Sequence, residues 1–437
     1  MAHGLRCFRS GLAMYGLVLA SVANTAATAS PGDPPLTIET AARQVVSWHP
    51  AVIEASGVVG QADAEVSAAR AGYSPIISAG LGSGYDSRVS GTWRPRPQIG
   101  AQQMLFDFGK VSSAVESARA GTRIGRAELL LAVDTLVRDT SYALIELQRS
   151  IALRDVAREQ AERIADISKL VGERSDKGAA TRSDALQAQA RVEAAQATLS
   201  QIEAEVRRWS SNLAYLMNRQ TVSSVSADVP DWLMRSCTAP MPAWSEIPSV
   251  MVAEARADQA GAEVRRNRAE RYPTLSLGGD ASTDFASPFG DRSIYNFGLR
   301  VSSNIFGGGV TGARVRGAEF ARGAAEAAAT RARLDTSQRM AEAQQQIESL
   351  ARLNDTLASR TASMKETGRL YQLQYLQMGT RTLVDLLNAE QELQQVRFEA
   401  VNNAHDLRRL QTDCLFLSGR TRDAFGLTGT SIGGVTL

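Results

Sequence analysis

The chain has 437 residues and a formal net charge of +2 at pH 7; 44% of its residues are hydrophobic and 22% are charged. So small a net charge shows no electrostatic bias towards nucleic acid, and the apolar fraction excludes a globally disordered chain. The 13 prolines fall into two groups that leave residues 98–229 and 289–437 free of proline. Because proline interrupts helices, these tracts can hold very long helices, unlike an ordinary compact α/β enzyme.

Residues 1–29 have the layout of a secretory signal peptide. Residues 1–11 carry two arginines and no acid, residues 12–23 form a short apolar stretch, and residues 27–29 supply a small-residue cleavage site. The apolar stretch is too short to cross a bilayer, which needs about 20 residues. Cys7 precedes it, so we expect no lipoprotein anchor. The mature protein is therefore expected to leave the cytoplasm.

An internal duplication is the most informative feature of the chain. Five short segments recur in the same order at an offset of 198 to 201 residues. The matching segments are 50–52 with 248–250, 61–66 with 259–264, 73–75 with 272–274, 105–109 with 305–309, and 178–184 with 379–385. The pattern predicts two copies of one structural unit, with a period far longer than that of ordinary solenoid repeats.

Each unit is predicted to contain a helix, a pair of strands, and two long helices joined by a turn. Gly178 and Gly379 occupy equivalent places in the two turns, which we expect to form the helix-turn tips. The predicted units are, in chain order, a first repeat over 30–220 with its strand pair in 73–106 and long helices over 108–216, a linker over 221–246, a second repeat over 247–417 with its strand pair in 272–306 and long helices over 308–417, and a flexible C-terminal tail over 418–437.

The predicted strands alternate between apolar and polar side chains. Residues 273–285 and 295–306 show the alternation most clearly, and the first copy repeats it more loosely. A period of two places one set on each face of a sheet. Strands of about 10 or more residues with aromatic residues near their ends fit a transmembrane β-barrel. The alternative is a pair of soluble hairpins packed on the helices.

Four strands cannot close a barrel, and lipid does not tolerate open strand edges. Several chains must therefore contribute, and three copies would supply twelve strands. An uninterrupted helix over 108–175 would run about 100 Å and would need neighbours alongside it. The predicted fold class is mixed α+β, in which a long α-helical coiled-coil barrel continues a trimeric 12-stranded transmembrane β-barrel.

The long helices also carry apolar residues in a heptad pattern. Such a pattern predicts the a/d seam of a coiled coil. The seam positions are Val192, Ala195, Leu199, Ile202, Val206, Trp209, Leu213 and Leu216 in the first copy, and Leu393, Val396, Ala400, Asn403, Leu407, Leu410, Cys414 and Leu417 in the second.

Two cysteines remain after signal cleavage, Cys237 and Cys414. In an oxidising compartment they could form a disulfide, and two buried free thiols are the equal alternative. His49 and His405 lie far apart in the sequence and away from any cysteine cluster, so we expect no metal site and no cofactor.

No motif predicts an enzyme. The glycine-rich residues 80–84 lie within a strand pattern and do not open a helix, so they are not read as a nucleotide loop. Residues 307–309 lack the Lys-Ser/Thr of a phosphate loop, and we expect them to mark a bend between strand and helix.

Together, the duplication, the strand pairs, the segment 105–109 that opens a long helix, and the Gly-x-x-Thr-x-x-Asp turns resemble the TolC family of outer-membrane channel proteins. The resemblance covers essentially the whole mature chain. It implies a homotrimer whose helical tunnel crosses the periplasm, closes like an iris at its tip, and opens when an inner-membrane pump and its adaptor dock. It also implies an equatorial region midway along the tunnel, to which residues 218–247 and the C-terminal stretch after Leu417 would belong.

The turn at 379–388 is the most specific local match to that family. The resemblance implies that Arg381 contributes to closed-state links and that Asp385 lies at the first acidic position of the pore constriction. The second acidic position is occupied by Asn388, which departs from a double acidic ring.

Physical chemistry supports a pore role for Asp385, because a ring of three carboxylates attracts cations. The alternative is local. Asp385 and Asp184 both follow a threonine by three residues, a spacing typical of a capping box at a helix N-terminus. Capping carries at least equal weight for Asp184.

The leading hypothesis is a passive exit duct in the cell outer membrane, serving type I protein secretion with an inner-membrane ABC transporter and a periplasmic adaptor. The grounds are the absent lipoprotein cysteine, the turn 379–382, and the stretch 406–415. The first alternative is an exit duct for small-molecule or metal efflux, for example with an RND pump. The second, of a different class, is a periplasmic coiled-coil scaffold without a pore. Outer-membrane lipid is an expected partner of the secretion duct and of the efflux duct. Nucleic acid is not an expected partner under any of the three hypotheses.

Overall fold

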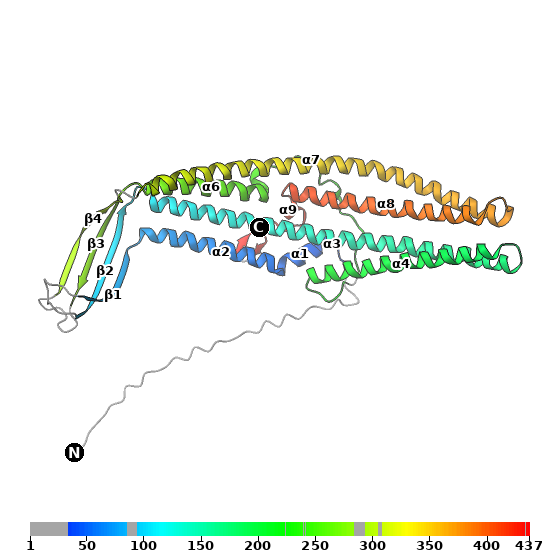
Figure 1. Ribbon diagram of the computed structural model, residues 1–437, viewed down its shortest axis with the longest axis horizontal. Helices are drawn as coiled ribbons and strands as arrows, with labels where there is room; N and C mark the ends of the chain where they lie inside the picture. The colour runs from blue at the N-terminus through cyan, green and yellow to red at the C-terminus, as the bar shows by residue number, and fades with distance from the viewer. Residues whose placement is uncertain are drawn as a thin grey trace, which may run out of the picture.

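The computed structural model describes residues 34–84, 94–222, 224–238, 240, 242–283, 293–304, 308–432 and 434–437. The predicted signal peptide lies outside the described residues. The chain is elongated, with a four-stranded sheet at one end and two helix-turn-helix tips at the other (Figure 1). No helix within the described ranges combines the length and the apolar character needed to span a membrane.

The order of elements repeats along the chain, so that each copy passes from helix to strand pair to two long helices. The elements of the first copy are α1 (Ile38–Trp48), α2 (Pro50–Arg70), η1 (Ala71–Tyr73), β1 (Ile76–Gly84), β2 (Arg94–Phe106), α3 (Lys110–Asp176) and α4 (Arg182–Leu216). Those of the second are α6 (Pro248–Ala269), β3 (Thr274–Ser282), β4 (Ile294–Ser302), α7 (Val310–Leu373), the π-helical turn η3 (Gln374–Met378) and α8 (Leu383–Leu417). The remaining elements are α5 (Asp231–Met234) and η2 (Trp244–Glu246) in the linker, and α9 (Thr421–Ala424), β5 (Ser431–Ile432) and β6 (Val435–Thr436) at the C-terminus.

Both longest helices begin directly after a glycine in the left-handed region. Gly109 precedes α3 with φ 93°, and Gly309 precedes α7 with φ 85°. Before α3, the Asp107 carboxylate also accepts backbone N–H bonds from Gly109 (3.0 Å) and Val111 (2.6 Å), which satisfies donors that the first helical turn leaves free. With no proline in its interior, α3 then continues for 67 residues, or about 100 Å.

The four strands form one antiparallel sheet in the order β1-β2-β3-β4, and within one chain β1 and β4 are its open edges. Its register separates the side chains by face, as the alternation predicted. One face carries Ile77, Ala79, Leu81, Pro97, Ile99, Ala101, Leu275, Leu277, Ala281, Tyr295, Phe297, Leu299 and Val301, with the polar residues Ser83 and Gln103 among them. The other carries Ser78, Gln98, Gln102, Thr274, Ser276, Asp280, Asn296 and Arg300, with Ile76, Met104 and Ile294 among them.

Three of the strands are shorter than the ten or more residues we expected. β1, β3 and β4 have 9 residues each, whereas β2 has 13. The predicted strand ends at 285 and 305–306 lie outside the described residues. The mixed α+β fold class with an internal duplication is confirmed.

The predicted heptad seams lie at the packed faces of α4 and α8. Every seam position in both copies is buried or half-buried. One of them is polar: Asn403 is 5% exposed, and its Nδ2 donates to the Leu350 carbonyl oxygen (2.9 Å) and to Asn354 Oδ1 (2.7 Å) of α7. Both hydrogens of its amide nitrogen are therefore satisfied, whereas its Oδ1 is buried without a hydrogen-bond partner in the described part of the chain.

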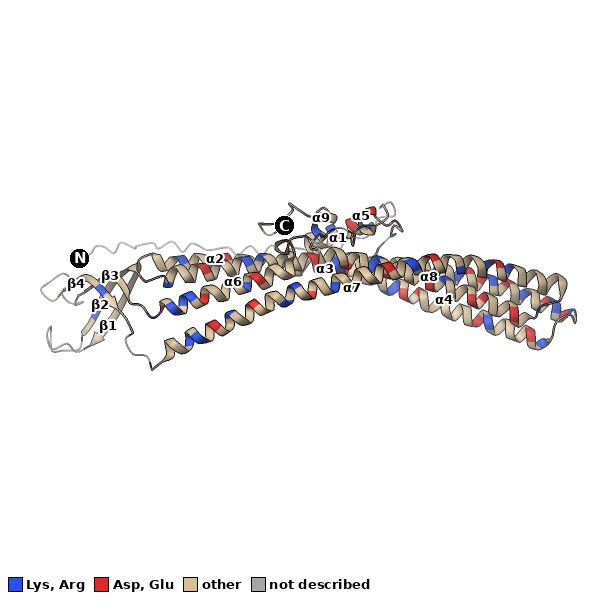
Figure 2. Ribbon diagram, turned by 90° about the horizontal axis from the view of Figure 1, so that it is seen from above, with Lys and Arg blue, Asp and Glu red and all other residues tan. Residues whose placement is uncertain are grey.

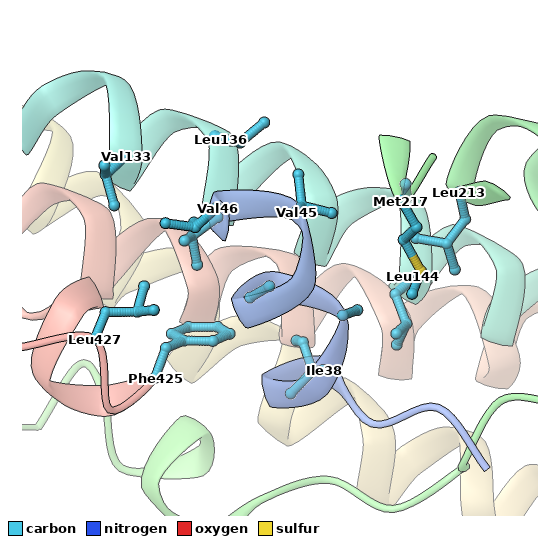
Figure 3. Close-up of a cluster of buried hydrophobic side chains, with 14 of the residues drawn as sticks. Ile38, Val45, Val46, Val133, Leu136, Leu144, Leu213, Met217, Phe425 and Leu427 are labelled. Carbon is cyan, nitrogen blue, oxygen red and sulfur yellow. The ribbon is translucent and has the colours of Figure 1, made fainter. Parts of the chain in front are cut away.

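The prediction of a flexible C-terminal tail over 418–437 is wrong. Phe425 is fully buried, 5.0 Å from the ring of Trp232, and Leu427 is 3% exposed. Both join the central cluster that α1 forms with α3, in which Val45 and Val46 also lie (Figure 3). The segment is ordered because these apolar side chains are removed from water in a core that distant parts of the chain supply.

Candidate functional site

The tip between α3 and α4 is a tight turn built on a glycine and a capping box. Gly178 follows α3 with φ 71°. At the start of α4, the Asp184 backbone N–H donates to Thr181 Oγ1 (3.1 Å), and the Thr181 N–H donates to Asp184 Oδ2 (3.1 Å). The structure therefore places Asp184 in a capping role.

The tip between α7 and α8 has the same chemistry. Gly379 has φ 62°, and the Asp385 N–H donates to Thr382 Oγ1 (3.2 Å). In return, Asp385 Oδ2 accepts from the Thr382 N–H (3.1 Å) and hydroxyl (2.9 Å). These bonds, with the charge of Arg381, lower the pKa of the Asp385 carboxyl. The group is thus held as an anion at the exposed end of the molecule.

Arg381 contacts its own hairpin. Its guanidinium carbon lies 4.5 Å from the centre of the Tyr371 ring, and its Nε donates to Gln374 Oε1 (3.3 Å). Asn388 is exposed on α8, three residues after Asp385. Within one chain, therefore, Arg381, Asp385 and Asn388 lie at the α7–α8 tip, whereas Asp184 lies at the α3–α4 tip. Arg381 has no ion pair to an acid in the described part of the molecule.

Arg174 of α3 links the two tips, a contact that the sequence did not predict. Its Nη1 donates to the Leu376 carbonyl oxygen (3.3 Å), and its guanidinium carbon lies 5.2 Å from the centre of the Tyr375 ring. Tyr375 is 8% exposed and packs in the apolar cluster of this end, and burial raises its pKa. The carbonyl that Arg174 contacts belongs to the π-helical turn, a feature with no sequence signal of its own.

Behind the tip, ion pairs join α3 of the first copy to α8 of the second. Glu390 is 7% exposed, and its Oε2 lies 3.3 Å from Arg163 Nη2. Burial raises the pKa of the Glu390 carboxyl. One turn before Arg163 on α3, Glu159 pairs with Arg397 of α8 (2.5 Å), which lowers the pKa of the Glu159 carboxyl. The two hairpins are thus held together by partly desolvated charges.

The same interface continues towards the middle of the molecule. The Tyr142 hydroxyl donates to Asp413, and Arg409 Nη1 lies 3.1 Å from Glu146 Oε1. His405 is 5% exposed, and burial lowers its pKa to about 4, so it is neutral at pH 7. An open cavity of about 370 Å³ lies beside these groups, lined by Gln346, Ser349, Leu350, Asp406, Arg409, Leu410 and Asp413.

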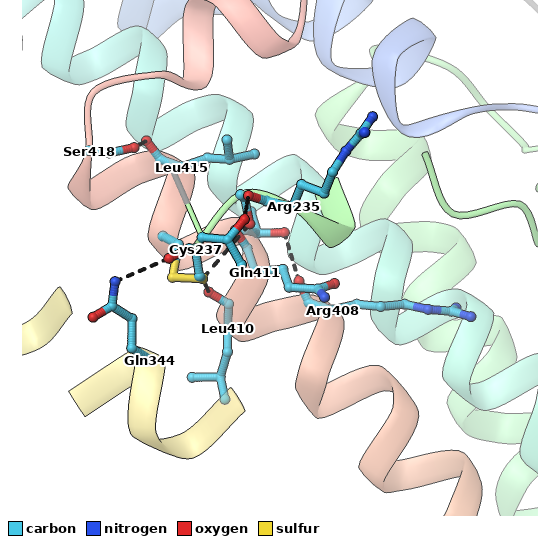
Figure 4. The surroundings of a disulfide bond; sticks show 12 residues. Arg235, Cys237, Gln344, Arg408, Leu410, Gln411, Leu415 and Ser418 are labelled. Carbon is cyan, nitrogen blue, oxygen red and sulfur yellow. Dashed lines mark hydrogen bonds between the residues drawn. A yellow bond between two sulfur atoms is a disulfide. The ribbon is translucent and has the colours of Figure 1, made fainter. Parts of the chain in front are cut away.

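A disulfide joins Cys237 in the linker to Cys414 in α8, with 5.3 Å between their Cα atoms (Figure 4). The surrounding backbone is also bonded, because Gln344 of α7 donates to the Cys237 carbonyl oxygen (3.1 Å) and the Ser236 hydroxyl donates to that of Gln411 (2.8 Å). The linker is thereby tied to both helices of the second hairpin. The described residues contain no cluster of three or more potential metal ligands.

Known proteins share both the sequence pattern and the fold. The family described as outer membrane efflux protein matches residues 43–219 and again residues 242–414, which are the two copies. The chain is 24% identical over 382 residues to the outer membrane efflux protein BepC of Brucella suis biovar 1 (strain 1330), covering 84% of this chain and 81% of BepC.

Several crystal structures are similar to this fold, including one from Pseudomonas aeruginosa and one from Vibrio cholerae. A membrane protein from Pseudomonas aeruginosa has a TM-score of 0.79 at 19% identity, over 87% of this chain and 90% of that protein. The outer membrane protein VceC from Vibrio cholerae has a TM-score of 0.77 at 17% identity, over 87% and 96% of the two chains.

Proposed function

Because the chain belongs to the outer membrane efflux protein family, we propose that three copies of it form the exit duct of a type I protein secretion system. The protein is an efflux channel of the outer membrane. Beyond the family's channel function, we propose that the protein is a trimer, that its inner-membrane partner is an ABC transporter, and that its cargo is a protein. An ABC transporter supplies the energy, a periplasmic adaptor bridges the two membranes, and the duct itself has no enzymatic role.

One observation supports the trimer above all others: the sheet has two open edges and one predominantly apolar face. Phe297 is 90% exposed and Ile77 71% exposed in the single chain, which is favourable only if lipid covers that face. Unpaired edge groups in lipid cost several kcal/mol each. Pairing β4 of one copy with β1 of the next removes every edge, and three copies give the twelve strands of a closed barrel.

The helical tips support a gate at the other end of the duct. In the single chain, Arg174 and the apolar cluster around Tyr375 hold the α7–α8 tip against α3. Opening requires that tip to move away from α3. An adaptor that binds the tips of the open form more tightly would shift the equilibrium in that direction.

Type I secretion is favoured by the turn 379–382 and by the stretch 406–415, the two segments whose resemblance to that branch is greatest. Small-molecule efflux is the competing function. The two are separated by deleting the gene in cells that carry it. A type I duct predicts loss of a secreted protein from the medium with unchanged sensitivity to toxic small molecules. If the deletion instead raised sensitivity to toxic small molecules and left all secreted proteins in the medium, the protein would be an efflux duct and not a type I secretion duct.

The channel itself is tested on the purified full-length protein. We expect a trimer that runs as one band in unheated detergent gels and dissociates on heating, together with stepwise conductance in planar bilayers. A monomer that gives no conductance steps would favour the periplasmic scaffold instead.

A further inference from the structure

Charged residues are sparse on the sheet, as the ribbon colours of Figure 2 show, and they are unevenly distributed along its polar face. Lys110, the first residue of α3, extends to β3, where its Nζ donates to Thr274 Oγ1 (2.9 Å). Thr274 is the first residue of β3 and lies on the polar face. A helix residue therefore places its ammonium group at the end of the sheet that meets the helices.

A second cation lies at the same level. Arg300 of β4 pairs with Ser276, the next residue after Thr274 on the polar face of β3. Diagonal neighbours of this kind are roughly 7–8 Å apart. The Arg300 side chain is exposed and has no ion pair or side-chain hydrogen bond in the described part of the chain.

Neither Asp107 nor Asp280 forms an ion pair with Lys110 or Arg300 in the described part of the chain. Both oxygens of Asp107 accept backbone N–H bonds at the start of α3. Asp280 accepts from Asn296 (3.1 Å) and lies four residues further along β3, or about 13 Å away. Residues 76–84 of β1, which would lie beside β4 of a neighbouring copy, contain no charged side chain.

We propose that Lys110 and Arg300 form a cationic ring at the floor of the barrel, where the tunnel opens into it, and that this ring binds the carboxylate or phosphate groups of anionic cargo. The inference rests on the proposed trimer, in which the polar face lines the pore and each copy contributes both residues. The Asp385 carboxylates would select cations at the tips, and this ring would select anions at the other end of the duct. A closed, narrow lumen strengthens such fields relative to open water.

The test uses full-length protein in planar bilayers at about 0.1 M salt, where the Debye length is about 10 Å. Inorganic tripolyphosphate is added on the side to which the barrel opens. We expect it to block the current of the unmodified channel and expect Lys110→Gln/Arg300→Gln to raise the half-blocking concentration by about tenfold or more. The reversal potential in a KCl gradient should shift towards cations in the same variant.

Two matched variants locate the effect. Arg300→Lys keeps the charge and should keep the block. Arg96→Gln removes a like charge from the same face at the far end of β2, about 27 Å from the level of Ser276, and should change the block little. Equal loss of block in Arg96→Gln and the double variant would overturn the ring at the floor.

The remaining outcomes are equally distinct. Unchanged block in the double variant would refute the inference while the conductance steps still support the channel. Absence of conductance in the unmodified protein would instead refute the proposed function. If the double variant does not assemble, Arg300→Gln alone is measured, and it should lose part of the tripolyphosphate block. Unchanged block in this single variant would count against the ring.

Discussion

Asp184 and Asp385 show how one residue type can serve structure and function at once. Each is the third residue of its helix and shares a capping box with the preceding threonine. The sequence left capping and pore lining open for Asp385, and the structure shows the capping bonds. A capped carboxylate at an exposed tip keeps its charge, so the pore role remains a prediction compatible with capping.

Asp385→Asn separates the two roles, because the amide keeps an oxygen for the Thr382 N–H and loses the charge. We expect lower cation selectivity, since three negative charges leave the proposed constriction. The measurement is the reversal potential in a KCl gradient, with Asp184→Asn as the matched capping residue of the other copy. A reversal potential that Asp385→Asn leaves unchanged would remove Asp385 from the pore.

Asp134 is the least exposed acid among the described residues that pair with an arginine. Its side chain is 1% exposed, and its Oδ2 lies 2.6 Å from Nη1 of Arg422, which follows the start of α9. Burial raises the pKa of the Asp134 carboxyl to about 7, against the lowering effect of Arg422. This pair fastens the C-terminal segment to α3.

The raised pKa predicts how the attachment depends on pH. Between about pH 4 and 7 the folded state keeps a proton that the unfolded segment has released, so stability falls as pH rises, by up to about 1.4 kcal/mol per pH unit. We expect hydrogen exchange in residues 418–437, corrected for intrinsic rates, to quicken from pH 5 to pH 8. Asp134→Asn should abolish that dependence. Asp139→Asn, which changes an exposed acid on the same helix, should not.

At the scale of elements, segments far apart in the sequence are joined in two ways, by ion pairs and by a disulfide. Buried and half-buried ion pairs hold α3 against α8 over several turns, and the disulfide holds the linker against α8. Cys414 is both a heptad seam position and a disulfide partner. A bond between residues 177 positions apart restricts the unfolded chain strongly, in the loop-entropy account of disulfide stabilisation.

The disulfide predicts a single Cys237–Cys414 peptide in non-reducing mass spectrometry and no thiol that maleimide can label in the mature protein. Cys237→Ser should destabilise the linker by about 2–5 kcal/mol, the usual range for loss of a native disulfide, seen as faster hydrogen exchange over 231–238. Met234→Ala, which changes an exposed side chain of α5 and keeps the disulfide, is the control. Two alkylated cysteines in unreduced protein would establish the free-thiol alternative.

For the molecule as a whole, the two faces of the sheet require different surroundings: lipid against the apolar face and water against the polar face. Successive residues of β4 point to opposite faces, so Phe297 lies on the apolar face and its neighbour Asn296 on the polar face. Membrane insertion and trimer assembly are therefore linked, because the same strands meet lipid and close the barrel.

Phe297→Arg tests this arrangement. An arginine facing lipid costs about 2–4 kcal/mol at the bilayer midplane, and each copy in the trimer bears that cost. We expect loss of the heat-dissociable trimer and of conductance, whereas Asn296→Arg, one residue away, should assemble. Equal assembly of both variants would show that this face does not contact lipid.

Much of this architecture follows from local patterns in the chain. The period of two along 273–285 and 295–306 predicted which strand residues share a face, and the heptads predicted which positions of α4 and α8 are packed. The Gly-x-x-Thr-x-x-Asp spacing predicted both capping boxes. Each pattern can be read from the sequence because its period is that of the strand or helix that carries it.

Contacts between distant residues had no such signal. Arg174 could pair with many groups, and only packing of α3 beside the π-helical turn brings it to Leu376 and Tyr375. Likewise, no local pattern predicted that Phe425 and Leu427 are buried, because the core that covers them is supplied by α1 and α3, far away in the sequence.

By itself, then, the sequence determined the duplication, the long helices, the two-faced strands and the capped tips, since these depend on the backbone periods of single elements. Only the tertiary structure decided that the cysteines are bonded, that Asp134 meets Arg422, and that Lys110 and Arg300 lie at one end of the polar face. Those outcomes depend on which segments far apart in the chain come together, and burial and hydrogen bonding choose among partners that sequence spacing leaves equivalent.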